Sequence, residues 1–110
     1  MTDINQVTIL GNLGADPEHK KEIDFKVSSF SVATNRFIKE PSGDFKQLEP
    51  EWHKIACYDR LSEKVIDKNI KKGDRVLVTG RSQTKKYTDS DNNVKYFQQI
   101  VATNMELVQD

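Results

Sequence analysis

Five segments of this chain are rich in Val, Ile, Leu, Phe and Tyr, and turn-forming residues separate them. In several of them Ser, Thr or charged residues are interspersed among the hydrophobic residues, which is typical of β-strands with one face in a core. The predicted strands span residues 4–13, 24–37, 52–58, 75–87 and 94–108. In the second, the apolar phase shifts between Val27 and Phe30, which predicts a β-bulge there.

One further segment has the period of a helix. Its hydrophobic residues recur at near-helical spacing and are Leu61, Val65, Ile66 and Ile70. Lys71 and Lys72 place favourable charges after the last turn, and Gly73 is a typical stop signal. We therefore expect a single helix over residues 61–70.

The predicted elements follow the order strand, strand, strand, helix, strand, strand. Residues 38–51 contain Pro41, Gly43 and Pro50 and predict a mobile hairpin loop, and residues 88–93 predict a second loop. A helix between the third and fourth of five strands matches the five-stranded Greek-key barrel called the OB-fold. We expect residues 1–110 to form one all-β domain of this kind, with one helix.

Composition restricts the core and the partners that this fold supports. Hydrophobic residues make up 35% of the 110 residues and charged residues 31%, so the core must be thin. The 17 Lys and Arg residues are balanced by 17 Asp and Glu residues. A polyanionic partner is therefore attracted only if the cations gather on one surface.

Several classes of function are disfavoured. Cys57 is the only cysteine, and with only His19 and His53 beside it the chain forms no disulfide and no usual zinc site, so we expect neither metal nor cofactor. No two carboxylates share a strand face beside a His or Ser, so we expect no enzymatic activity.

No apolar run approaches the roughly 20 residues that cross a bilayer, and the start lacks a signal sequence. We expect the bacterial cytoplasm, with the mitochondrial matrix as the alternative.

The strand over residues 52–58 has two chemically different faces. A period of two places Trp52, Lys54, Ala56 and Tyr58 on one face, and His53, Ile55 and Cys57 on the other. Since Ile55 and Cys57 can supply the core, Trp52 and Tyr58 are available to a ligand. A lone tryptophan is more often a core residue, but its parity with Lys54 and Tyr58 favours the ligand hypothesis.

Two other clusters repeat this mixture of rings and cations. The strand over residues 75–87 aligns Arg81, Gln83, Lys85 and Tyr87, with Lys86 at the edge. Arg36 and Lys39 flank Phe37 at the start of the long loop. Arg60 opens the helix, where a phosphate contact and an ion pair with Asp59 or Glu63 are equally plausible.

Rings and cations in this arrangement suit single-stranded nucleic acid. Each unstacked base offers a π-face to an aromatic ring, worth about 1–3 kcal/mol per base, and Lys and Arg neutralise the phosphates. Duplex DNA has its bases already stacked and gains nothing from the rings. The alternative for Tyr87 is a cross-strand pair with Val94 or Tyr96.

The order of several motifs resembles a known family. The chain begins N-Q-V-T-I-L-G-N-L at residues 5–13, continues with D-P-E at 16–18 and E-W-H-K at 51–54, and carries T-K-K-Y-T-D at 84–89. Together these motifs resemble the bacterial and mitochondrial single-stranded DNA-binding proteins over nearly the whole chain. The literal G-x-x-G at residues 11–14 does not fit a KH domain, because a strand precedes it.

The resemblance implies particular roles and partners. The base-stacking aromatics of the family fall on Phe37, Trp52, Tyr58 and Tyr87, and Phe37 and Tyr87 stand where some members carry tryptophan. Members usually form homotetramers, and the position of His53 lies at a subunit contact in some of them. Bacterial members usually continue into a disordered tail with an acidic tip that recruits replication and repair proteins. This sequence ends at Asp110, just after the last predicted strand, which suits either a trimmed chain or a tailless relative.

The leading hypothesis is therefore sequence-independent binding of single-stranded DNA in replication, recombination and repair. A second hypothesis is a protein-interaction module that uses the same barrel in a replication-restart or repair complex. A third is an RNA-binding OB domain of the cold-shock type, although nothing in the sequence is suited to recognising a 2′-hydroxyl.

Overall fold

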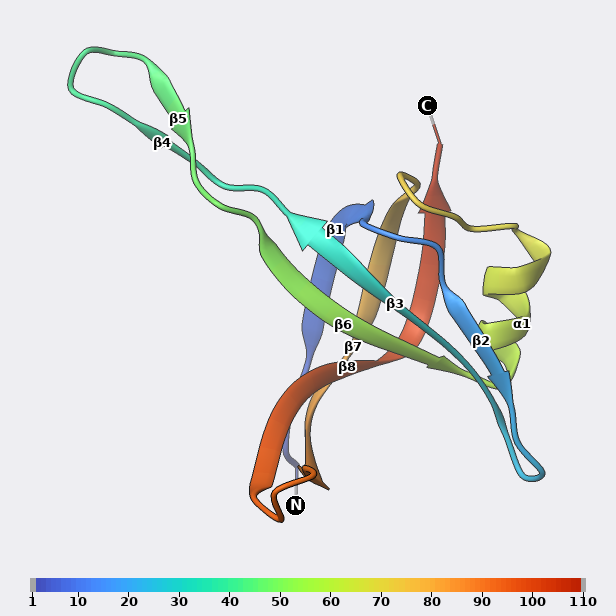
Figure 1. Ribbon diagram of the computed structural model, residues 1–110. Helices are drawn as coiled ribbons and strands as arrows, with labels where there is room; N and C mark the ends of the chain where they lie inside the picture. The colour runs from blue at the N-terminus through green and yellow to red at the C-terminus, as the bar shows by residue number, and fades with distance from the viewer. Residues whose placement is uncertain (1, 110) are drawn as a thin grey trace.

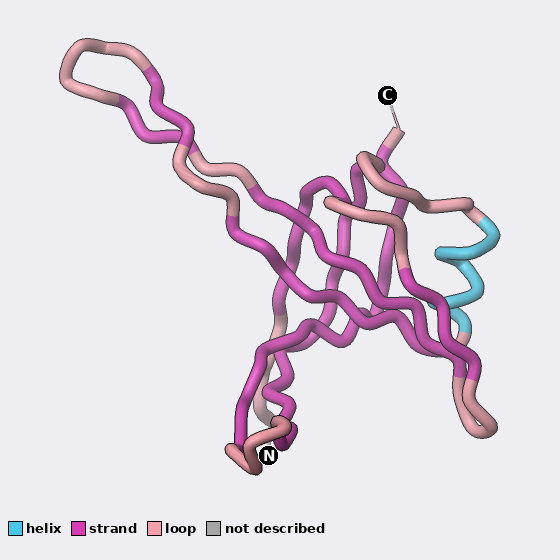
Figure 2. Tube along the Cα trace, in the orientation of Figure 1, coloured by secondary structure: helices cyan, strands magenta, loops and turns pink. Residues whose placement is uncertain are grey.

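The computed structural model describes residues 2–109, which form eight strands and one helix (Figures 1 and 2). In chain order these are β1 (Val7–Leu13), β2 (Glu18–Lys21), β3 (Lys26–Thr34), β4 (Phe37–Lys39), β5 (Phe45–Gln47), β6 (Glu51–Tyr58), α1 (Arg60–Asp67), β7 (Arg75–Thr88) and β8 (Val94–Val108). The expectation of a mostly β protein with one helix is confirmed.

Five of the strands close on themselves. The main sheet has the order β1-β7-β8-β6-β3-β2, and β1 also pairs with β3, so β1, β7, β8, β6 and β3 form a closed circuit of pairings. All of these pairs are antiparallel except β6 with β8, which is parallel. The helix α1 lies between β6 and β7 in the chain. The β4–β5 hairpin forms its own two-stranded sheet and projects from the body (Figure 1).

The prediction of five strands was too low. Strand β2 has the sequence EHKK and is exposed along its length, so no hydrophobic pattern marks it, and it forms only because β3 offers a free edge. Strand β5 and all of β4 except Phe37 lie inside the segment that we predicted to be a loop. They pair with each other through Phe37 with Gln47 and Lys39 with Phe45, so this segment is a regular hairpin arm.

The predicted bulge between Val27 and Phe30 is wrong. Strand β3 pairs with β6 in unbroken register, and Ser28 takes the buried position that an apolar residue would normally hold. Its hydroxyl lies 2.7 Å from the Ser62 hydroxyl of α1 and 2.7 Å from Nδ1 of His19, which satisfies its hydrogen-bonding capacity. A buried polar group with partners costs little, so the apolar phase shifts without a shift in the backbone.

The helix ends three residues earlier than predicted, at Asp67. Asn69 adopts φ 52°, its N–H donates to the Ile66 carbonyl at 2.9 Å, and the Ile70 N–H donates to the Val65 carbonyl at 3.2 Å. These two bonds form a Schellman motif, and the buried side chains of Ile70 and Val65 are its hydrophobic contact. Ile70 thus belongs to the apolar pattern of the helix without belonging to the helix.

The core lies inside the closed circuit and under α1. Its buried residues come from all five strands of the circuit and from the helix region, and include Ile9, Phe30, Val32, Ile55, Cys57, Val65, Val78 and Met105. Burial raises the pKa of the Cys57 thiol to about 12, so the group stays protonated and unreactive at neutral pH.

A close approach of two backbones completes the circuit. Strands β1 and β3 pair only through Asn12 with Ala33 and Leu13 with Val32. Just before this contact, a Cβ on Gly11 would overlap the Ala33 carbonyl oxygen. The absence of a side chain at Gly11 therefore lets β1 reach β3.

Gly11→Ala should lower the free energy of unfolding by about 1–3 kcal/mol, because overpacking forces β1 and β3 apart. Urea denaturation monitored by circular dichroism measures this change. Thr8→Ala, at an exposed position of the same strand, is the control and should change stability by less than about 0.5 kcal/mol. Equal stability of Gly11→Ala and the unaltered protein would contradict the role given to this contact.

Candidate nucleic-acid interface

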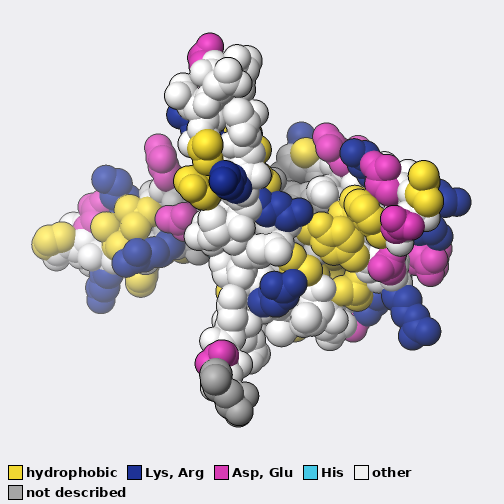
Figure 3. Space-filling model, turned by 90° about the horizontal axis from the view of Figure 1, so that it is seen from below, with side chains coloured by type: hydrophobic (Ala, Val, Ile, Leu, Met, Phe, Trp, Pro, Cys, Tyr) yellow, Lys and Arg dark blue, Asp and Glu magenta, His cyan; other side chains and the backbone are white. Residues whose placement is uncertain are grey.

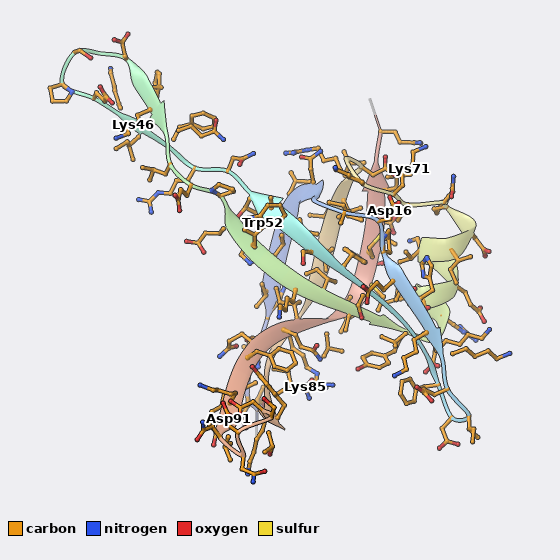
Figure 4. The ribbon with its side chains drawn as sticks, viewed as in Figure 1. Asp16, Lys46, Trp52, Lys71, Lys85 and Asp91 are labelled. Carbon is orange, nitrogen blue, oxygen red and sulfur yellow. The ribbon has the colours of Figure 1, made fainter. Side chains whose placement is uncertain are left out.

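Strand β6 presents the face that its alternation predicts. Ile55 and Cys57 are buried, whereas Trp52 is 56% exposed and Lys54 is exposed. Figure 4 places Trp52 where β6 leaves the projecting β4–β5 hairpin. Trp52 and Lys54, which form the first half of the predicted face, are therefore open to a ligand.

Ala56 and Tyr58, which form the second half of this face, are less exposed than predicted. Ala56 is buried, because it pairs with Ser29 on one side and Val101 on the other. Tyr58 is half-buried, and its ring centroid lies 5.8 Å from that of Phe25. The structure thus places Tyr58 on the predicted face, at the opposite end of β6 from Trp52.

Strand β8 brings a ring that the sequence analysis missed. The parallel pairing of Ile55 with Ile100 sets β8 beside β6. Lys54 Nζ then lies 5.0 Å from the centroid of the Phe97 ring, a cation–π contact worth about 0.5–1 kcal/mol at an exposed site. Period-two alternation back from buried Ile100 would have separated Phe97 from Tyr96, but only the pairing with β6 shows which face meets Lys54.

Strand β7 extends the same face. Arg81, Gln83, Lys85 and Tyr87 pair with Val101, Gln99, Phe97 and Lys95 of β8, respectively. The half-buried Lys85 is therefore directly opposite Phe97, and the Tyr87 and Phe97 ring centroids are 5.9 Å apart at an interplanar angle of 59°. The alternative pairing of Tyr87 with Val94 or Tyr96 is wrong, since Tyr87 pairs with Lys95.

Lys86 does not join this surface. It pairs with Tyr96, and both residues lie one position out of phase with Lys85 and Phe97, on the reverse face of the β7–β8 hairpin. We call the surface formed by Trp52, Lys54, Phe97, Lys85 and Tyr87 the ring face.

Two grooves border the ring face and meet on it. The larger, of about 800 Å³, runs between Trp52, Phe97 and the segment 14–18. The smaller, of about 420 Å³, runs from the same residues toward Val7 and Ser82. The side chains that line both grooves are Trp52, Lys54, Phe97 and Gln99.

The backbone of Gly14 supports the Trp52 ring. A Cβ on Gly14 would overlap indole carbons Cζ3 and Cη2. The Gly14 N–H donates to the Ser31 carbonyl at 3.2 Å, which fixes this segment beside β3. Because Gly14 has no side chain, the Trp52 indole packs against its backbone and remains half exposed.

The β4–β5 hairpin carries a separate pair of rings. Phe37 is 58% exposed and Phe45 is 72% exposed, and the register places both on one face with Lys39 and Gln47. Figure 3 shows hydrophobic side chains beside Lys and Arg on this arm, at the left of the view. Arg36 is exposed at its base. We missed Phe45 because it falls inside the predicted loop, where no alternation was sought.

Arg60 lies away from the ring face. It borders a hollow of about 370 Å³ with Asp24, Phe25 and Glu63. Neither predicted ion pair of Arg60 occurs within the described residues: Glu63 pairs instead with Lys26 at 2.9 Å. A phosphate contact at Arg60 remains a prediction.

The two histidines have structural partners. His53 is half-buried, and its Nε2 lies 2.9 Å from the Thr34 hydroxyl.

Within residues 2–109 no three His, Cys, Asp or Glu side chains are grouped so as to hold a metal ion. In that same range, no helix has the length and apolar character needed to cross a membrane.

Comparison with known proteins assigns the chain to a family. The family described as "Single-strand binding protein family" matches residues 4–108. This chain belongs to that family. It is 33% identical over 107 residues to Single-stranded DNA-binding protein 1 of Chlorobaculum tepidum, covering 96% of this chain and 65% of the relative. It is also 33% identical over 107 residues to the single-stranded DNA-binding protein of Bacteroides thetaiotaomicron, covering 96% and 66%.

Solved structures of single-strand binding proteins share the fold. The Plasmodium falciparum SSB complex with ssDNA superposes with a TM-score of 0.84 at 28% identity, over 99% of this chain and 98% of that one. A deletion mutant of the Thermus aquaticus single-stranded DNA binding protein gives 0.80 at 21% identity, over 96% and 51%. The chain thus spans about two thirds of the length of the two bacterial relatives named above.

In this member of the single-strand binding family, Gly14→Ala should displace the Trp52 indole and increase its exposure. Trp52 is the only tryptophan, so acrylamide quenching of intrinsic fluorescence reports on it directly. Ala15→Ser, at the exposed neighbouring position, should leave quenching unchanged. Identical quenching of Gly14→Ala and the unaltered protein would show that Gly14 does not position the ring.

Proposed function

We propose that this chain binds single-stranded DNA without sequence specificity and coats exposed strands during replication, recombination and repair. Bases stack on exposed aromatic rings, and Lys and Arg neutralise the phosphates. The observation that carries this proposal is the ring face, where Trp52, Phe97 and Tyr87 from three strands lie together with Lys54 and Lys85.

The exposure of these rings leaves them available for a ligand to cover. Phe37, Trp52 and Tyr87 are 58%, 56% and 48% exposed, although each ring would gain free energy from burial. A stacked base recovers about 1–3 kcal/mol per ring, and it does so whatever its identity, because every base has a π-face. Several weakly selective contacts therefore give strong binding without sequence preference.

Charge is segregated in the way that a polyanion requires. The chain as a whole has zero net charge. Yet the positions of β6, β7 and β8 that are in phase with the ring face, within residues 52–58, 81–87 and 95–101, carry four cations and no carboxylate. The cations are Lys54, Arg81, Lys85 and Lys95. Asp16 and Glu18 border the larger groove at its far side, and the Asp16 carboxylate accepts a hydrogen bond from the Lys72 backbone N–H at 2.8 Å.

The assignment to the OB-fold and to a homotetramer belongs to the same proposal. The closed circuit of five strands, with α1 between β6 and β7, supports a Greek-key OB barrel to which β2 adds an edge strand. Leu10 and Leu77 pair on the outer side of β1 and β7 and are 45% and 37% exposed, a surface suited to another subunit. Native mass spectrometry measures the number of subunits. We place His53 near such a contact by family resemblance.

Titration of Trp52 fluorescence with oligo-dT and with duplex of equal length tests the function. Stacking should quench the emission for the single strand only. The logarithm of the association constant should also fall with the logarithm of salt concentration, with a slope of about −3 if Lys54, Arg81, Lys85 and Lys95 all contact phosphates. Equal responses to single strand and duplex would reject the proposal.

Trp52→Ala should weaken binding of fluorescently labelled oligo-dT by about 5- to 150-fold, because one stacked base is lost. Fluorescence anisotropy measures this affinity without the tryptophan signal. Ile23→Ala is the matched control, since Ile23 is a fully exposed hydrophobic side chain in the turn between β2 and β3, away from the ring face. A comparable loss in both variants would show that general surface hydrophobicity, and not the ring face, binds the strand.

A further inference from the structure

We propose that Phe97 is an additional nucleobase platform, which Lys54 covers in the free protein and vacates when a strand binds. This inference rests on the proposed function, because it concerns how the same surface takes up single-stranded DNA. It assigns a role to a ring that the sequence did not single out.

Phe97 lies where the two grooves share their lining. It lines both grooves, together with Trp52 and Gln99, so a strand that runs from one groove into the other crosses the Phe97 ring. The ring also lies between the two other aromatic positions of the ring face, Trp52 on β6 and Tyr87 on β7. A base at Phe97 would bridge the bases stacked at those two positions.

Two side chains lie against the Phe97 ring, and neither is an aromatic ring stacked parallel to it. The 59° angle between Tyr87 and Phe97 is a tilted contact, so the Tyr87 ring does not stack flat on Phe97. The group that does lie over the ring is the ammonium of Lys54, 5.0 Å from the centroid. Lys54 is exposed and forms no ion pair with any of residues 2–109, so no salt bridge holds it in place.

Displacement of the Lys54 ammonium by a nucleobase is favourable for the Phe97 ring and for the ammonium. An exposed cation–π contact corresponds to about a 2- to 5-fold effect on an equilibrium constant, whereas a stacked base corresponds to about 5- to 150-fold. The displaced ammonium keeps its flexible four-carbon stem and reaches the phosphate next to the stacked base. Lys85, directly opposite Phe97, supplies a second cation at the same step of the strand.

Substitution of Phe97 separates stacking from a purely structural role. Phe97→Leu keeps an apolar side chain of similar bulk and removes the flat ring, so it should fold normally by circular dichroism and bind oligo-dT about 5- to 150-fold more weakly. Phe97→Tyr should restore binding. Tyr96→Ala is the matched control, because Tyr96 is the adjacent residue, is 66% exposed and lies on the reverse face of the hairpin. An equal loss from Tyr96→Ala, or no loss from Phe97→Leu, would overturn the inference.

The salt dependence shows whether Phe97 acts on the base or only through Lys54. Lys54→Met should reduce the magnitude of the salt slope by about 0.7, the value for one phosphate contact to single-stranded nucleic acid. Phe97→Leu should leave that slope unchanged, and its effect should multiply with that of Lys54→Met in the double variant. If Phe97→Leu instead reduces the slope like Lys54→Met, and the double variant is no weaker than either single one, Phe97 merely positions Lys54 and the platform does not exist.

Failure of this inference is distinguishable from failure of the proposed function. If the unaltered protein does not prefer oligo-dT over duplex, the function itself is rejected. If it does prefer oligo-dT and Trp52→Ala weakens binding, but Phe97→Leu does not, only the role of Phe97 is rejected.

Discussion

The ring face depends on a short parallel pairing between β6 and β8. Only two residue pairs form it, Ile55 with Ile100 and Ala56 with Val101. Because side chains alternate along both strands, burial of Ile55 and Ile100 in the core fixes the opposite face at the same time. Lys54 and Phe97 meet there as a consequence of core packing, and a shift of one residue in either strand would separate them.

The same strands serve the core along one part of their length and the candidate site along another. Residues Val76 and Val78 of β7 are buried, whereas Lys85 and Tyr87 reach the ring face in the projecting part of the β7–β8 hairpin. The change coincides with a register shift at Thr79 and Gly80, where a Cβ on Gly80 would overlap the Val101 carbonyl. A bulge of this kind increases twist and bends the hairpin. The residues that stabilise the core and the residues that a ligand can reach thus occupy different parts of the same strands.

The sequence alone predicted those features that the alternation of side chains along a single strand determines. The strand with Trp52 and Lys54 on one face and Ile55 and Cys57 on the other was predicted from alternation, because a single strand decides both faces. The partner of Tyr87 was not, since it depends on the register of a hairpin whose turn was not resolved in advance. Strand β2 escaped prediction because its four residues are polar and its pairing depends on the edge of β3. Phe97 was missed because its contact with Lys54 comes from the tertiary pairing of β8 with β6, and Phe45 was missed because it lies inside the predicted loop.

Ultraviolet cross-linking of oligo-dT to the protein, with the cross-linked residues identified by mass spectrometry, tests the central claim most directly. If nucleobases lie against the ring face, the cross-links should fall on Trp52, Tyr87 and Phe97. Cross-links confined to Tyr96, on the reverse face of the hairpin, and to Thr8 and Leu10, at exposed positions of β1, would contradict the account.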